Sequence, residues 1–143
     1  MTANRSAPWA RIVPVLAVAD VPQAVAWYVS VLGLVEHVRV GEGHRVQLGF
    51  DGDRAELIVR EIGDEERASN TTDQVMVRVD DVAGVLETAR SNGADASDTA
   101  RDQPYGERQA GFVDPFGHEW VLTQTLRDVD PHEWGGETVV PRR

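Results

Sequence analysis

The chain begins its recognisable pattern with a mostly apolar run from Arg11 to Val18, which predicts a strand interrupted at Pro14. Its side chains would alternate between two faces, Ile12, Leu16 and Val18 on one and Val13, Val15 and Ala17 on the other. Apolar residues then recur at helical spacing as far as about Leu32. Asp20 precedes this segment as a helix N-cap, and Gly33 follows it as a C-cap. The first 33 residues therefore predict a strand followed by a helix.

Three further segments in the first half favour strands, at about residues 34–41, 44–51 and 55–61. Gly41-Glu42-Gly43 and Asp51-Gly52-Asp53 separate them and have the composition of hairpin turns. The polar segment from Glu61 to Thr72 is the expected linker to the second half.

The second half repeats this order. Asp73 to Val79 alternates again, and Asp80 or Asp81 caps a helix predicted from about Val82 to Ser91. Residues 94–102 predict at most a short edge strand. Two strands follow, at residues 107–113 and 118–124, joined by a turn of the composition Asp114-Pro115-Phe116-Gly117.

The two halves also align residue by residue. Val18-Ala19-Asp20-Val21 matches Val79-Asp80-Asp81-Val82 at an offset of 61 residues, and Glu56-Leu57-Ile58 matches Glu119-Trp120-Val121 at an offset of 63. We therefore predict an α+β fold of two tandem βαβββ modules, at residues 11–62 and 73–124, within a single domain spanning 1–143. Residues 125–143 form a C-terminal extension.

The amino-acid composition excludes several kinds of chemistry and argues against some partners. The 143 residues include no cysteine, which excludes thiolate catalysis and disulfides. All 14 basic residues are arginine, against 24 acidic ones, and the net charge of −10 argues against a nucleic-acid partner. The acidic balance favours a cationic small molecule or simply maintains solubility. No apolar run is long enough to span a membrane and no signal peptide is visible, so we expect no membrane partner and a cytoplasmic location.

These motifs resemble those of the vicinal oxygen chelate superfamily, which includes glyoxalases, bleomycin resistance proteins and dioxygenases. The resemblance rests on Leu16 to Val21 with Ala26-Trp27-Tyr28 in the first module, and on the run from Pro104-Tyr105-Gly106 to Trp120 in the second. It implies a cupped mixed sheet with a ligand inside, and a homodimer whose cups use strands from both chains.

The resemblance also implies where a metal would be bound. The family's enzymes place His, Gln or Glu ligands at positions that correspond here to Val13, Ile58, Gln74 and Val121. Three of these side chains are aliphatic and cannot donate an electron pair to a metal. A shift of two residues would exchange Ile58 for Glu56, which still leaves two donors. We therefore expect no metal and no other cofactor.

Strand alternation selects candidate residues for the wall of the cup. They are mostly apolar, with a few polar groups that could anchor an organic ligand: Val13, Val15, Gln74, Met76, Arg78, Arg108, Phe112, Glu119 and Val121. The alternative is that these side chains simply fill a narrow core. Tyr105 and Trp120 fit either a rim or a packing role, and His118 is expected to stabilise its turn.

The leading hypothesis is a binding protein that sequesters a small organic molecule, cationic or aromatic, without bond chemistry and without an assigned catalytic residue. One alternative is a metal-independent enzyme that uses Glu119 or His44 as general acid or base. Another is a metalloenzyme, a lyase or dioxygenase, whose ligands lie at other positions.

Overall fold

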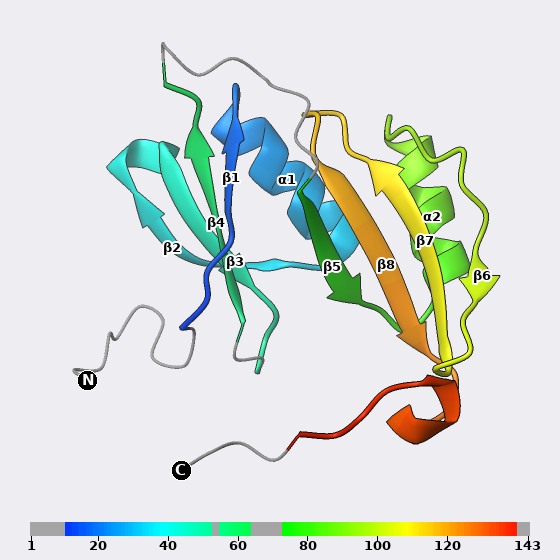
Figure 1. Cartoon of the computed structure of the whole chain (residues 1–143). Coiled ribbons are helices and arrows are strands. Elements are labelled where there is room, and N and C mark those ends of the chain that lie inside the picture. The colour runs from blue at the N-terminus through cyan, green and yellow to red at the C-terminus, as the bar shows by residue number, and fades with distance from the viewer. Residues whose placement is uncertain (1–10, 53–54, 64–72, 140–143) are drawn as a thin grey trace. The chain divides into compact units, whose positions relative to one another are not determined.

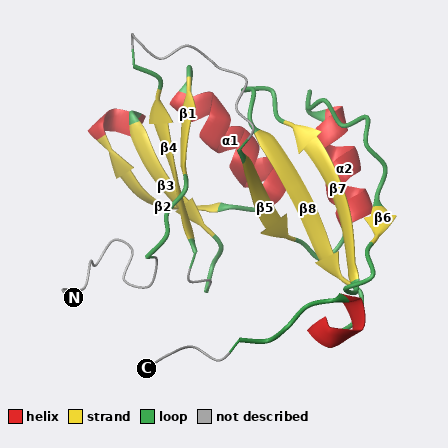
Figure 2. Ribbon diagram, viewed as in Figure 1, coloured by secondary structure: helices red, strands yellow, loops and turns green. Residues whose placement is uncertain are grey.

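The computed structural model describes residues 11–52, 55–63 and 73–139, which form two compact units. The first unit comprises residues up to 73 together with the turn at 114–118, and the second comprises residues 74–113 and 119–143. Each unit is a four-stranded mixed sheet with one α-helix (Figures 1 and 2). The predicted fold class is therefore confirmed. Trp9 lies outside the described residues, as does most of the expected linker.

The first unit contains β1 (Val15–Val18), α1 (Val21–Leu32), β2 (Val35–Val40), a 3₁₀ turn η1 (Gly41–Gly43), β3 (Arg45–Gly49) and β4 (Glu56–Glu61). The strand order is β1-β4-β3-β2, with β1 parallel to β4 and the other pairs antiparallel. Helix α1 begins where the Asp20 carboxylate accepts a hydrogen bond from Gln23 N, and it ends at the left-handed Gly33. Its buried face, which includes Val25 and Tyr28, belongs to a core with Leu48 and Val59.

The second unit contains β5 (Gln74–Arg78), α2 (Val82–Ser91), β6 (Arg101–Asp102), β7 (Glu107–Val113), β8 (Glu119–Thr125) and a 3₁₀ turn η2 (Pro131–Trp134). Its strand order, β5-β8-β7-β6, repeats that of the first unit. Asp81, rather than Asp80, caps α2 through a hydrogen bond from Gly84 N. The expected edge strand within residues 94–102 is reduced to β6 and a single bridge between Asp95 and Val113.

Strand register confirms the internal repeat. Val15 pairs with Ile58 in the parallel β1–β4 ladder, and Met76 pairs with Val121 in the parallel β5–β8 ladder. The alignment of Ile58 with Val121, inferred from sequence, is therefore the structural one.

The predicted strand at 11–18 is too long, because β1 begins at Val15. Pro14 has no backbone N–H for a ladder, although its carbonyl accepts a hydrogen bond from Ile58 N at 2.9 Å. Ile12 is 87% exposed and takes no part in the core.

Asp114 organises the turn at 114–118 within the first unit. Its Oδ1 accepts hydrogen bonds from the backbone N–H groups of Phe116 and His118, at 2.8 and 2.9 Å. Its Oδ2 accepts a buried 2.6 Å hydrogen bond from the Tyr28 hydroxyl on α1. The aspartate that identifies this turn in the sequence is therefore a structural residue.

We expect Tyr28→Phe to lower the free energy of unfolding by about 1–3 kcal/mol, because a buried carboxylate oxygen loses a hydrogen-bond donor. Urea denaturation measures the change. Tyr105→Phe is the control, since it removes a partly exposed hydroxyl that donates to Gln109. A loss from Tyr28→Phe no larger than that of the control would contradict the structural role.

Candidate functional site

The two faces of the second sheet differ in character. Residues paired across neighbouring strands share a face, so the register places Phe112 with Trp120 and Gln109 with Thr123. The face that carries Phe112 and Trp120 is apolar. Its residues Trp120 and Leu122 are fully buried, as is Val82 of α2. The second face carries polar side chains on β5, β7 and β8, and we call it the open face.

A pocket of about 470 Å³ lies on the open face. Strands β5, β7 and β8 contribute one side of it, and the turn before β7 and the C-terminal segment contribute the rest. Its lining residues are Met76, Arg78, Tyr105, Glu107, Gln109, Thr123, Thr125, Arg127, Asp128, Val129 and Trp134.

Glu107 is the centre of the pocket's hydrogen-bond network. Although it is charged, it is only 8% exposed. Its Oε1 accepts hydrogen bonds from Arg78 Nη2 at 2.9 Å and from the buried Thr123 hydroxyl at 3.1 Å. Thr123 in turn accepts from Gln109 Nε2, and Gln109 accepts from the Tyr105 hydroxyl. The polar wall of the pocket is therefore held in one arrangement before any ligand binds.

The hydrogen bond from Thr125, and then that from Arg78, hold the pKa of the Glu107 carboxyl below its usual range, against the opposing effect of burial. A carboxyl whose pKa is lower in the folded state stabilises the fold above its unfolded-state pKa. This contribution is lost as the pH falls through the folded-state pKa.

We therefore expect Glu107→Gln to flatten the loss of stability that the protein shows as the pH falls below about 4.3. Urea denaturation at a series of pH values measures the slope. Glu133→Gln is the control, because it removes an exposed carboxyl that forms no ion pair among the described residues. The same slope in Glu107→Gln and wild type would argue against this linkage.

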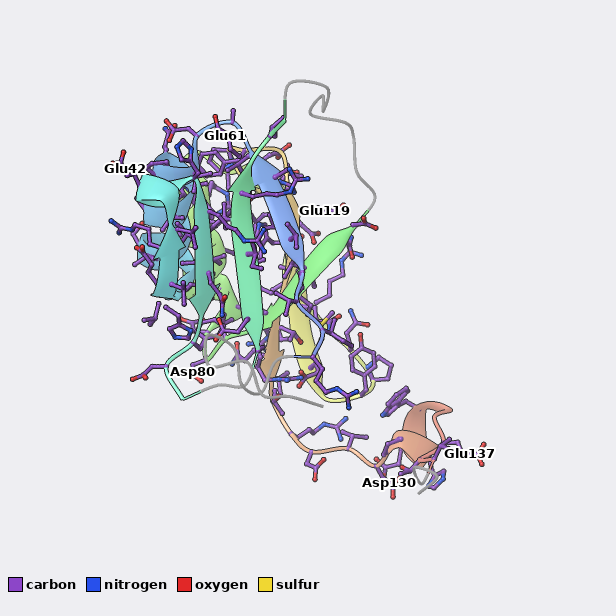
Figure 3. The ribbon with its side chains drawn as sticks, turned by 90° about the vertical axis from the view of Figure 1, so that its left-hand side faces the viewer. Glu42, Glu61, Asp80, Glu119, Asp130 and Glu137 are labelled. Carbon is purple, nitrogen blue, oxygen red and sulfur yellow. The ribbon has the colours of Figure 1, made fainter. Side chains whose placement is uncertain are left out.

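Two aromatic side chains, Tyr105 and Trp134, also line the pocket. The rings of Tyr105 and Trp134 contact each other edge to face, with centroids 5.4 Å apart. Trp134 is 43% exposed and Met76 is 57% exposed, so both present apolar surface at the pocket. Trp134 lies in η2, whose first residue follows Asp130, labelled in Figure 3. Asp130 caps this turn by accepting from His132 N.

Gly106 fixes the C-terminal segment beside the pocket. Its carbonyl accepts hydrogen bonds from Leu126 N and Arg127 N, at 2.8 and 3.3 Å. Its φ of +84° favours glycine, and a Cβ there would lie 2.3 Å from the Arg127 carbonyl oxygen. The C-terminal extension therefore forms part of the wall of this pocket.

The residues expected to line the cup lie in three different places: on the open face of the second sheet, on its other face, and in the first unit. Gln74, Met76 and Arg78 share the open face of the second unit with Glu119 and Val121. Met76 and Arg78 line the pocket, whereas Gln74 donates a 2.8 Å hydrogen bond to Glu119 at the start of β8. Glu119 is labelled in Figure 3.

Two expected lining residues lie on the other face of the second sheet. Phe112 is buried and stacks on Trp120, with ring centroids 6.4 Å apart. Arg108 forms an ion pair with Asp102 at 2.7 Å. The expectation that they face the ligand with Val121 is corrected by the β7–β8 register, which pairs Val121 with Gly111. Trp120, for which the sequence left rim and packing roles open, is a core residue.

The remaining two, Val13 and Val15, belong to the first unit. Val13 precedes β1 and is half-buried, and Val15 is 49% exposed.

Sequence reasoning missed Glu107, Gln109, Thr125 and Trp134. Glu107 and Gln109 alternate with Arg108 and Ala110, so the signal for their shared face was present. Which face carries the ligand wall depends on the hairpin register, and the position of Trp134 depends on how the extension folds back.

The metal positions implied by the fold lack suitable donors. Val13 and Ile58 in the first unit and Val121 in the second are aliphatic, and the Gln74 amide donates to Glu119. Within the described ranges, no three His, Asp or Glu side chains gather as metal ligands. These residues do not fit the family's metal site.

The histidines have structural partners. His118 Nε2 lies 2.8 Å from the Ala17 carbonyl within the first unit, which agrees with the role expected in its turn. His44 Nδ1 lies 2.9 Å from Glu61 Oε2, and both side chains are exposed. His37, for which the sequence showed no partner, contacts Glu56 across the first sheet.

No helix within the described residues has the length and apolar character needed to cross a membrane.

Comparison with known proteins places this architecture in a family. TioX from Micromonospora sp. ML1 is 32% identical over 80% of this chain and 98% of its own, with a TM-score of 0.64. TnmS3, an antibiotic binding protein from Streptomyces sp. CB03234, is 24% identical over 79% and 93%, with a TM-score of 0.63, which is a likeness of fold. An uncharacterized protein from Mycobacterium bovis is 36% identical over 59 residues, which is 41% of this chain and only 39% of that protein.

The family model for the Glyoxalase/Bleomycin resistance protein/Dioxygenase superfamily matches residues 10–122. The chain therefore belongs to this superfamily.

Proposed function

We propose that the protein binds a small organic molecule with an aromatic part in the pocket of the second unit, and holds it without changing its bonds. The observation that carries this proposal is the pocket itself. Its volume of about 470 Å³ falls in the usual range for small-molecule sites. It combines apolar surface from Met76 and Trp134 with a few fixed polar groups.

The polar groups in this pocket suit orientation of a ligand better than proton transfer. Glu107 accepts several hydrogen bonds that favour its charged form, and Arg78 is paired with it. Such a carboxylate is a poor general base, because its protonated form is disfavoured. Glu119, the alternative acid or base, is engaged with Gln74 and is not among the lining residues.

Similarity to an antibiotic binding protein is consistent with sequestration of a natural product, although the likeness to TnmS3 is one of fold. Binding would proceed without a metal, because the implied ligand positions are mostly aliphatic. Metal analysis of protein purified without chelator tests this part. About one bound ion per chain would contradict it.

The central test is a thermal-shift screen of the full chain against aromatic antibiotics and metabolites. A compound that binds in this pocket should raise the melting temperature and should be recovered unchanged by mass spectrometry. Met76→Glu should abolish the shift, because it places a carboxylate on the pocket's apolar surface. Val40→Glu is the matched control, since Val40 is a similarly exposed strand residue of the first unit, at 53%.

Three outcomes would overturn the proposal: no compound raises the melting temperature, Met76→Glu leaves the shift intact, or the stabilising compound is converted. Conversion that Glu119→Gln abolishes would favour the metal-independent enzyme. The expected homodimer remains a prediction, and sedimentation velocity of the full chain tests it.

A further inference from the structure

We infer that Arg78 selects ligands carrying an oxyanion, a carboxylate or phenolate, attached to or near their aromatic part. This inference rests on the proposed function, because it assigns the polar half of the same pocket. It differs from the expectation of a cationic ligand that the net charge of −10 suggests.

The hydrogen bonds of Arg78 leave part of its guanidinium group available. Nε donates to the Thr125 hydroxyl at 3.1 Å, and Nη2 donates to Glu107 at 2.9 Å. A guanidinium has five N–H donors, and only two are used in these bonds. Among the described residues Nη1 has no hydrogen-bond partner, and the side chain is 66% exposed at the pocket. The free donors therefore match a ligand oxygen.

The hydrogen bonds to Glu107 and Thr125 also hold the Arg78 guanidinium group in place. The Glu107 side chain is 11% exposed, and Thr123 fixes it in turn. A long arginine side chain normally loses conformational freedom when it binds an anion. Here the hydrogen bonds to Glu107 and Thr125 impose that order before the ligand arrives, which favours affinity and a defined ligand orientation.

The local charge balance differs from that of the whole chain. Glu107 compensates the charge of Arg78, and Arg127 and Asp128 are an exposed cation and anion that also line the pocket. The lining is therefore close to neutral. An unpaired donor group, rather than net charge, decides which ligand atom is recognised.

The apolar residues that line the pocket determine which non-polar group the ligand should carry. Tyr105 and Trp134 offer aromatic surface and Met76 offers a flexible thioether, all of which suit a planar ring. A ligand with a ring against these residues and an oxyanion toward Arg78 would use both the apolar and the polar lining of the pocket.

The experiment compares two probes that share a ring and differ in charge, 2-naphthoate and 2-naphthylmethylammonium. Titrations follow the indole N–H resonance of Trp134, assigned with Trp134→Phe. We expect 2-naphthoate to bind about tenfold or more tightly than the ammonium probe, since a hydrogen bond to a charged group has this order of effect. The preference should disappear in the double variant Arg78→Gln/Glu107→Gln, which removes the guanidinium without leaving Glu107 unpaired.

Two further single variants separate the effect of Arg78 from that of a neighbouring cation and from that of charge alone. Arg127→Gln removes a neighbouring cation of the same pocket that forms no ion pair among the described residues, and it should preserve the preference. Arg78→Lys keeps the charge but loses the planar fork, and it should reduce the preference even if the double variant fails to fold.

The outcomes separate this inference from the proposed function. Equal binding of both probes, or tighter binding of the ammonium probe, overturns the role of Arg78 and leaves an aromatic binding pocket. A preference that follows Arg127 instead of Arg78 also overturns it. Failure of both probes to shift the Trp134 resonance overturns the oxyanion site, and the proposed function fails with it if the compound screen also gives no hit.

Discussion

Replacing Trp120 with alanine should lower the free energy of unfolding by about 3–5 kcal/mol, the largest effect of any single substitution considered for this protein. Trp120 is fully buried, and it stacks on Phe112 with ring planes 8° from parallel. Removing the indole leaves a cavity beneath α2 that its neighbours can fill only in part. Because domains of this size are stable by about 5–15 kcal/mol, this loss is a large fraction of the total stability.

Urea denaturation with circular dichroism measures this loss. Trp134→Ala is the matched control, because it removes the same side chain from an exposed position in the same unit. The control should lose about 1 kcal/mol or less. Trp134→Ala should nevertheless weaken ligand binding, because Trp134 lines the pocket. Trp120→Ala should affect binding only through its loss of stability. Similar losses in the two variants would show that Trp120 is not the core residue described above.

Gly106→Ala should cost about 2–4 kcal/mol and should also impair ligand binding. One part of the cost is the left-handed backbone, which costs an alanine about 1–2 kcal/mol. The other part is the approach of the new Cβ to the Arg127 carbonyl oxygen, 2.3 Å away. Because the obstructing atom belongs to the backbone, relief requires the C-terminal segment to move, and Val129 and Trp134 move with it.

Gly135→Ala separates the two parts of this cost. Gly135 has a similar φ of +89°, but an added Cβ would meet nothing within 4 Å. We expect only the backbone part of the loss there, measured by the same denaturation experiment. Equal losses for the two variants would mean that the contact between Gly106 and Arg127 does not hold the segment in place.

Local sequence signals account for much of the fold. Asp20 and Gly33 delimit α1 because a short carboxylate satisfies free N–H groups and a glycine accepts positive φ, and both effects act within a few residues. The turn at Asp114 is predictable for the same reason. The repeat of these signals at a near-constant offset was enough to indicate two equivalent modules.

Which face of β7 lines the pocket and which packs against the helix was not predictable from the residues of β7 alone. Glu107, Gln109 and Gly111 form one face, and Arg108, Ala110 and Phe112 form the other, but alternation alone does not say which face packs under a helix. The pairing of Val113 with Glu119 decides it, because this register aligns Gln109 with Thr123. Without this register, the sequence is equally compatible with Arg108 and Phe112 on the ligand wall.

The sequence by itself therefore determined the two modules, the helix caps, the identifying turn and the poor fit to a metal site, because these depend on residue identity and near neighbours. Only the tertiary structure decided which polar groups share a pocket. Arg78, Glu107 and Trp134 come from a strand at one edge of the second sheet, from another strand and from the C-terminal segment, and they lie far apart along the chain. Strand register and the close contact at Gly106 bring them together, and both are properties of the folded chain.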